Sequence, residues 1–311
     1  MARLRAVFFG SPAFAVPSLR VVAADTELLA VVSQPDRPAG RGREPAAPAV
    51  KLAAAALGVP VLQPEKLRTP DLAATLAAYA ADVFVVVAYG RILPQALLDL
   101  PRLGPFNVHA SLLPRLRGAA PIQWSIIRGD AQTGVSIMRM EAGLDTGPVG
   151  ATRALPIADD DTAGTLSARL ADVGAALLRD TLPAIAGGNL VLTPQDDAAA
   201  TLAPPLAKSD GRLRFDAPAR AVSAQARGVD PWPGATALLD GEPLKLFAPR
   251  VVDAAAGGPP GEVLGLRSEG LVVACGEGAV AFGEMQLAGR RRMPAAAVLT
   301  GRAIAPGTRL G

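Results

Sequence analysis

The 311-residue sequence contains one cysteine, Cys275, and one histidine, His109. A single cysteine cannot form an internal disulfide, and these two residues together cannot supply the Cys/His cluster of a zinc finger or a zinc hydrolase. Aromatic residues make up only 4% of the chain, so stacking platforms for unpaired bases are scarce. No apolar run approaches the ~18 residues of a membrane-spanning helix, and Gly10, Pro12 and Pro17 interrupt the N-terminal stretch. We therefore expect a metal-independent, cytoplasmic protein without a signal peptide.

Charge of one sign is in small excess, and the excess is local. Before residue 205 the chain has 18 basic and 18 acidic residues, against 13 and 10 after it, so the whole net charge of +3 lies in the C-terminal third. This asymmetry suits a polyanionic partner but does not by itself decide for one. Hydrophobic residues make up 50% of the chain and charged residues 19%, which predicts a globular protein of about two domains.

Short apolar runs alternate with stretches whose apolar residues recur at helical spacing. The expected strands are 4–9, 28–33, 61–62, 82–88, 106–109 and 134–140, and the expected helices are 14–23, 48–57, 72–79, 120–128 and 162–185. This alternation predicts a doubly wound, mostly parallel Rossmann-like sheet with helices on both faces. Such sheets bind ligands beyond the carboxyl ends of their strands, so we expect the site on those loops.

The amino-acid composition and the spacing of apolar residues change after Gly187-Gly188. Residues 189–207 are rich in Pro, Ala and Thr and have the composition of a linker. Beyond them, short apolar runs separated by Gly, Pro and Asp are typical of a small, OB-like β-barrel. The expected division is a catalytic domain over 1–188, a linker over 189–207 and a β-barrel domain over 208–311.

Three polar side chains follow two of the expected strands. Asn107 and His109 lie at the end of the strand over 106–109, where strand alternation puts them on the same side. Asp145 lies in the glycine-flanked loop 143–148, which closes the next strand region. Histidine changes its charge near neutral pH, so an amide, an imidazole and a carboxylate on neighbouring loop ends indicate proton-transfer chemistry. Each residue alone also fits a plainer role, a packed histidine or a turn aspartate.

Long motifs surround these three residues. Residues 107–114 (NVHASLLP), 117–123 (RGAAPIQ) and 143–147 (GLDTG) closely resemble the signature of the 10-formyltetrahydrofolate-dependent formyltransferases. Residues 86–94 (VVAYGRILP) are similar to the loop of that family's folate pocket. One small departure is Ala110, where glycine is expected.

Two further segments resemble the members of the family that act on methionyl initiator tRNA. They are residues 34–42 (QPDRPAGRG) and residues 230–234 (DPWPG). Before the second segment the chain has Gly228-Val229, where an aromatic residue and an asparagine are expected. The resemblance runs from Gly10 to near the C-terminus.

The resemblance implies transfer of a formyl group from 10-formyltetrahydrofolate to the α-amine of methionine on initiator tRNA, for translation initiation. Amine attack on the formyl carbon creates an oxyanion and a positively charged nitrogen. Asn107 would donate to the oxyanion, His109 would donate a second hydrogen bond or relay the proton, and Asp145 would orient the ring and favour imidazolium. Direct attack by the amine needs no nucleophilic side chain. The sequence agrees with this, because Cys275 falls in the second domain and Ser111 has no second histidine to activate it.

The same resemblance places the two substrates. The implied folate-binding residues are Arg91, Ile92, Leu93, Ser111, Leu112, Leu113, Pro114, Glu141, Ala142, Gly143 and Leu144. The arginine-rich segment 35–44 is too irregular for a helix or a strand, and its guanidinium groups suit the phosphates and base edges of an acceptor stem. The implied tRNA-binding residues are Arg37, Arg41, Arg43 and Lys208. We expect a monomer that binds folate and initiator methionyl-tRNA and no membrane.

Two other functions compete with this one. A formyltransferase for a sugar nucleotide or a purine precursor would use the same catalytic trio, but the arginine-rich segment and the second domain argue against it. A tRNA-binding module that has lost catalysis is the second alternative, and the intact trio argues against that. An NAD enzyme is disfavoured because Gly10-Ser11-Pro12 lacks the second and third glycines of the dinucleotide fingerprint.

Overall fold

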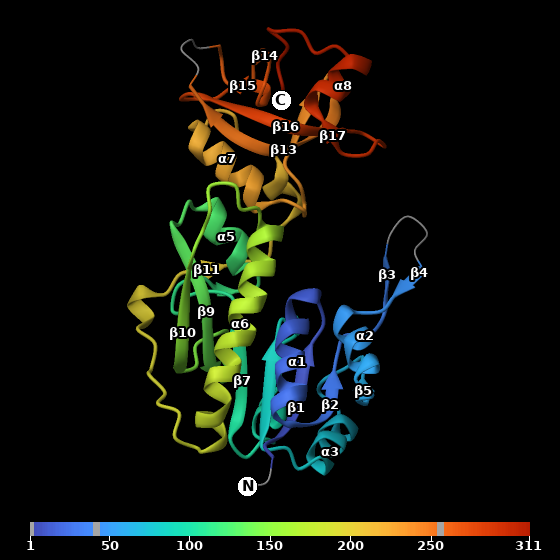
Figure 1. Cartoon of the computed structure of the whole chain (residues 1–311), viewed down its shortest axis with the longest axis vertical. Helices are drawn as coiled ribbons and strands as arrows, with labels where there is room; N and C mark the ends of the chain where they lie inside the picture. Colours follow the sequence, from blue (N-terminus) through green and yellow to red (C-terminus); the bar gives the residue numbers. More distant parts are fainter. Residues whose placement is uncertain (1–2, 40–43, 254–257) are drawn as a thin grey trace. The chain divides into compact units, whose positions relative to one another are not determined.

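The computed structural model describes residues 3–39, 44–253 and 258–311. The chain divides into two compact units (Figure 1). The first unit consists of Met1–Pro121, Thr133–Leu155 and Ser167–Ala203. The second consists of Ile122–Gln132, Pro156–Leu166 and Pro204–Gly311, so two segments that precede α6 (Ala163–Ala186) or include its start belong with the C-terminal part.

A seven-stranded sheet with the order β10-β9-β7-β6-β1-β2-β5 forms the first unit. Its strands are β1 (Arg5–Gly10), β2 (Glu27–Val32), β5 (Val61–Leu62), β6 (Val83–Val87), β7 (Gly104–His109), β9 (Gln132–Arg139) and β10 (Val149–Pro156). Strands β7, β6, β1, β2 and β5 pair in parallel, whereas β9 is antiparallel to β7. The mostly parallel sheet is therefore confirmed, and its strand β10 is an addition to the expected elements.

Helices connect and cover the parallel strands. They are α1 (Val16–Asp25), α2 (Ala49–Ala56), α3 (Pro70–Ala78), the short α4 (Gln95–Leu98) and the long α6 (Ala163–Ala186). Every residue of β6 is buried, and Phe9, Phe84 and Tyr89 share one core cluster. No helix in the described part of the chain is long and apolar enough to cross a membrane.

The arginine-rich segment differs from the expectation. It contains two short antiparallel strands, β3 (Arg37–Ala39) and β4 (Glu44–Ala46), where the sequence predicts neither helix nor strand. The register pairs Pro38 with Pro45. Proline has no N–H to donate to a ladder, so its presence in both strands hides the hairpin from pattern analysis.

Asp82 precedes β6 and ties that strand to β1. Its Oδ2 accepts a hydrogen bond from the backbone N of Arg5 at 3.0 Å, and its Oδ1 accepts one from Arg102 Nη2 at 2.8 Å. The hydrogen bond from the Arg5 backbone, together with the Arg102 guanidinium, lowers the pKa of the Asp82 carboxyl below its ordinary value. A lowered pKa means that the folded chain binds the proton less tightly than the unfolded chain.

Asp82→Asn is expected to lower the free energy of unfolding at neutral pH by about 1 kcal/mol, since it weakens the three hydrogen bonds that this charged acceptor receives from Arg5 and Arg102. The carboxylate contribution is fully present above the unfolded-state pKa and is lost as the pH falls through the lowered folded-state value, so the difference should shrink below about pH 4. Urea unfolding of both proteins at neutral and acidic pH measures this. An equal difference at both pH values would contradict it.

The second unit is built on an antiparallel sheet that curls into a half-barrel. Its strands are β12 (Thr236–Leu239), β13 (Glu242–Val252), β14 (Val263–Arg267), β15 (Gly270–Ala274), β16 (Ala279–Leu287) and β17 (Met293–Pro294). Its helices are α5 (Pro121–Ile127), α7 (Ala219–Gly228) and α8 (Ala295–Gly301). Gly228 lies against α5, where a Cβ atom would be 3.0 Å from the carbonyl oxygen of Gln123. This close approach disfavours a larger side chain at that position.

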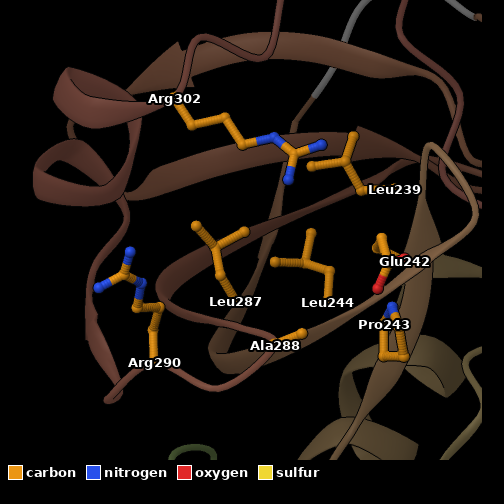
Figure 2. Close-up of a pocket in the computed structure, with 8 residues that line it drawn as sticks. All are labelled: Leu239, Glu242, Pro243, Leu244, Leu287, Ala288, Arg290 and Arg302. Carbon is orange, nitrogen blue, oxygen red and sulfur yellow. The ribbon is translucent and has the colours of Figure 1, made fainter.

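A hollow of about 240 Å³ opens between β12, β13 and the end of β16 in the second unit. Figure 2 shows three leucine side chains, Leu239, Leu244 and Leu287, that line it together with the arginines Arg290 and Arg302. Arg302 Nη2 donates to Asp240 Oδ2 at 2.9 Å, so its charge is already paired. None of the site residues expected from the sequence lines this hollow.

Candidate active site

The three predicted catalytic side chains meet in the first unit. Asn107 and His109 lie on β7, and Asp145 reaches them from the loop between β9 and β10. Asn107 Nδ2 donates to Asp145 Oδ1 at 3.4 Å, and Asp145 Oδ2 lies 3.7 Å from His109 Nδ1. The His109 side chain is 6% exposed and that of Asp145 is 14% exposed. Two polar groups and one carboxylate therefore share a largely desolvated site, where their interactions are strong.

The contacts of His109 define the role of each ring nitrogen. Nε2 lies 3.1 Å from the carbonyl oxygen of Leu116, which can only accept a hydrogen bond. Nε2 therefore carries a proton, and Nδ1 is the nitrogen that faces Asp145. In the neutral ring Nδ1 then has a free lone pair, and in the protonated ring its N–H points toward a carboxylate.

The backbone holds the Asp145 carboxylate in place. Asp145 adopts a left-handed conformation with φ of +52°, and its Oδ2 accepts a hydrogen bond from the backbone N of Gly118 at 2.9 Å. Gly147 follows in the same loop, and a Cβ there would collide with the carbonyl oxygen of Arg139. The glycine allows the loop to pass close enough to β9 for Asp145 to reach β7.

Ser136 fixes the loop that follows β7. It is fully buried on β9 opposite His109, donates to the carbonyl oxygen of Ser111 at 2.7 Å and accepts from the backbone N of Leu113 at 3.1 Å. The Ser111 hydroxyl in turn donates to the carbonyl oxygen of Arg115 at 2.6 Å. The proton of Ser111 is thus committed to the backbone, which agrees with its exclusion as a nucleophile.

Cys275 is also unsuited to nucleophilic chemistry. It is 6% exposed in the second unit, and burial raises the pKa of its thiol to about 11. A thiol with so high a pKa is almost entirely protonated at neutral pH, and the thiolate is the reactive form. Within residues 3–39, 44–253 and 258–311, no group of three or more His, Cys, Asp or Glu side chains could hold a metal ion.

The predicted folate-binding residues divide into exposed and buried ones. Ile92 is 75% exposed and Leu144 is 55% exposed, and both belong to loops that leave the sheet. Arg91 Nη1 donates to the carbonyl oxygens of Pro64 and Glu65, which anchors the loop after β6. Glu141, Ala142 and Gly143 are exposed, Leu112 and Pro114 are half-buried, and Leu93, Ser111 and Leu113 are buried.

The predicted tRNA-binding residues lie in separate places. Arg37 is exposed on β3, whereas Arg41 and Arg43 lie outside the described residues. Lys208 is exposed in the second unit, where it lines a cleft of about 470 Å³ with Arg212, Lys245 and Trp232. Trp232 is 54% exposed, so this cleft combines cations with an accessible aromatic ring.

Several residues support the trio without a role predicted from the sequence, although Arg117 lies in the motif 117–123. Gln195, Thr201 and Arg117 make hydrogen bonds around the catalytic loops, and two of them come from the segment expected to be a linker. In that segment β11 (Leu202–Ala203) pairs with β8 (Arg117–Gly118) in parallel. Polar residues in a region of linker composition carry no local signal of such contacts.

Both parts of the chain match one family. Residues 6–182 match the formyl transferase family, and residues 205–303 match the formyl transferase C-terminal domain. The methionyl-tRNA formyltransferase of Thiobacillus denitrificans (strain ATCC 25259 / T1) is 53% identical over 310 residues, which are 99% of this chain and 100% of the relative. That of Sorangium cellulosum (strain So ce56) is 50% identical, again over 99% of this chain and 100% of the relative.

Solved structures share the fold at much lower identity. HypX from Aquifex aeolicus, crystallised with tetrahydrofolic acid, superposes with a TM-score of 0.65 at 20% identity, over 96% of this chain and 47% of HypX. The sugar 3N-formyl transferase WlaRD superposes with a TM-score of 0.69 at 15% identity, over 94% of this chain and 100% of WlaRD. Since the family match covers more than half of the sequence and the relatives align over almost all of it, this chain belongs to the formyl transferase family.

Proposed function

We propose that this chain transfers the formyl group of 10-formyltetrahydrofolate to the α-amine of methionine on initiator tRNA, in line with its full-length relatives, which are methionyl-tRNA formyltransferases. One observation carries the proposal: Asn107, His109 and Asp145 converge at the end of β7, with the Nδ1 atom of His109 facing the carboxylate. This arrangement can stabilise a developing oxyanion and accept a proton, the two tasks that amine attack on a formyl carbon requires.

The reaction proceeds through a tetrahedral intermediate. The amine lone pair forms a bond to the formyl carbon, and the C=O π electrons move to the oxygen, where Asn107 Nδ2 donates a hydrogen bond. His109 Nδ1 takes the proton from the attacking nitrogen, and the resulting imidazolium lies beside the Asp145 carboxylate. The ring then returns this proton to N10 of the folate as the C–N10 bond breaks. No formyl-enzyme forms.

The folate would lie on the loops that follow β6 and β9. The exposed apolar side chains of Ile92 and Leu144 suit the faces of a flat pterin ring, and the backbone of 141–144 offers hydrogen-bonding groups. The buried Leu93, Ser111 and Leu113 would act by fixing the loop backbone rather than through their side chains. All of the folate-binding residues predicted from the sequence stay in the proposal, and the three buried ones have a supporting role.

The tRNA would be held by cations of both units. We propose that Arg37, Arg41 and Arg43 contact the acceptor end, and that 208–311 binds the tRNA body, with Lys208 as one phosphate contact. The net positive charge after residue 205 and the cationic cleft around Lys208 support this role. A catalytic domain over 1–188 and a connecting segment over 189–207 complete the proposed division.

Lys208→Ala is expected to raise KM for methionyl-tRNA about threefold to tenfold and to leave KM for the folate unchanged, because it removes one phosphate contact. The slope of log KM against log salt should fall by about 1. Steady-state kinetics at several salt concentrations measure both effects. Lys66→Ala, which removes an exposed lysine from the first unit, is the matched control. An unchanged slope would remove Lys208 from the tRNA interface.

A comparison of three amine acceptors tests the proposed activity directly. Purified protein is incubated with 10-formyltetrahydrofolate and either methionyl initiator tRNA, a nucleotide-linked amino sugar or a small amine acceptor. Formylation of the tRNA alone supports the proposal, and formylation of the sugar alone would replace it.

We propose that the protein works in the cytoplasm and that its active form is a monomer. Light scattering of the enzyme with and without tRNA would test the monomer.

A further inference from the structure

Gln195 holds the loop that carries Asp145. Its Nε2 donates to the carbonyl oxygen of Asp145 at 2.8 Å and to that of Gly147 at 2.7 Å. These two bonds span the left-handed turn at Asp145, whose φ is +52°. Non-glycine residues adopt this conformation only at a cost, so it persists only where its surroundings fix it.

The Gln195 amide is itself oriented by a buried arginine. Its Oε1 accepts a hydrogen bond from Arg117 Nε at 3.0 Å, and Arg117 Nη2 bonds to Asp197 Oδ1 at 2.8 Å. Arg117 is 7% exposed. Because a guanidinium only donates, the oxygen of the amide must face it, and the amide N–H groups must face the loop. The direction of the amide is therefore fixed by its partners.

Thr201 supports the other partner of His109. Its Oγ1 accepts a hydrogen bond from the backbone N of Leu116 at 2.9 Å, and the carbonyl oxygen of Leu116 lies 3.1 Å from His109 Nε2. The next backbone pair joins Arg117 N to the carbonyl oxygen of Thr201 at 2.8 Å. The segment 195–201 thus touches the supports of both imidazole nitrogens.

We propose that Gln195 and Thr201 are positioning residues, which hold Asp145 and Leu116 so that the His109 ring keeps one orientation. The proposal rests on the proposed function for its kinetic readout, whereas the orientation of the ring is independent of any substrate. The segment 195–201, which the sequence predicts as linker, then supports the catalytic site. A displacement of about 1 Å in a reacting group can cost about 100-fold in rate, so the effect is measurable.

The test compares four variants with the wild-type chain. Gln195→Met keeps the length of the side chain but removes both donors, and Gln195→Glu keeps an acceptor for Arg117 but turns oxygen toward two carbonyls. Thr201→Val removes the acceptor for the Leu116 N–H, and Thr201→Ser restores it. Gln95→Met is the matched control, because it removes an exposed hydrogen bond to Asp99 in the same unit.

Two measurements are made at one pH on each variant. The first is kcat and KM for both substrates, and the second is the ¹⁵N and ¹H resonances of the imidazole. Since His109 is the only histidine in the chain, its ring signals are assigned without further variants. A merely structural role would not move these signals in a protein that keeps its melting temperature.

We expect both Gln195 variants to lower kcat about 10- to 100-fold, to leave each KM within about threefold and to shift the His109 ring signals. Thr201→Val should lower kcat about tenfold, and Thr201→Ser and Gln95→Met should match the wild type. Unshifted ring signals, or kcat within twofold of the wild type, would overturn the proposal. If Gln195→Met does not fold, Gln195→Glu and the Thr201 pair decide it. If the wild type formylates no tRNA, the proposed function falls, while the ring signals still test the positioning.

Discussion

His109→Ala is expected to lower kcat by about 10²- to 10⁴-fold. The substitution removes the group that accepts the amine proton and leaves the Asp145 carboxylate without its partner at 3.7 Å. In free energy the loss corresponds to about 3–5 kcal/mol of transition-state stabilisation. Single-turnover formylation of methionyl-tRNA, with both substrates saturating, measures the chemical step directly.

Two controls separate lost chemistry from a lost fold. The His109 side chain is buried, so its removal leaves a cavity, and the melting temperature and folate affinity of the variant must be measured beside its activity. Folate binding within about threefold of the wild type would show an intact site. A folded variant that retains more than a tenth of the wild-type kcat would contradict proton transfer by His109.

Asp145→Asn is expected to lower kcat by at least about 10²-fold, although the new side chain has almost the same shape. The amide oxygen can still accept the hydrogen bond from the Gly118 backbone, so the loop should fold. The neutral amide lacks the charge that stabilises the imidazolium, and its NH₂ group would face the Asn107 Nδ2 donor in place of the oxygen that accepts from it. The measured quantity is again kcat with both substrates saturating, with the melting temperature as control.

The double variant His109→Ala/Asp145→Asn tests whether the two residues act as one unit. If the carboxylate works through the imidazole, the double variant should have nearly the same kcat as His109→Ala alone. Losses that simply multiply would mean that Asp145 acts independently of the ring. The role of Asp145 would then have to be sought in substrate binding.

Much of the fold could be predicted from the sequence. The apolar runs that form β1, β6 and β7 are fully or largely buried, as is the second half of β2, and such strands have a strong local pattern between turn residues. The long helix α6 follows from its regular apolar spacing and its Gly187-Gly188 end. These elements are stabilised by burial of their own side chains, so the spacing of apolar residues in the sequence predicts them.

Other elements left little pattern to detect. Strand β10 lies at the edge of the sheet, and all of its residues are half-buried or exposed, so it has no apolar periodicity. Helices α7 and α8 follow prolines in a region of short strands and were outside the expected elements. The apolar pattern also could not predict that β9 runs antiparallel to β7, because a buried apolar run has the same composition in parallel and antiparallel pairing.

For the site, the sequence by itself determined the residue types and the loops: an amide and an imidazole at the end of β7, and a carboxylate between glycines. Only the tertiary structure decided which atoms meet, since Asp145 lies 38 residues from Asn107 and Gln195 lies 50 residues from Asp145. Hydrogen bonds between distant residues impose no periodicity on either segment. They form only when the sheet order brings the Asp145 loop to β7 and the path of 189–203 brings Gln195 to that loop. That packing is a property of the whole fold.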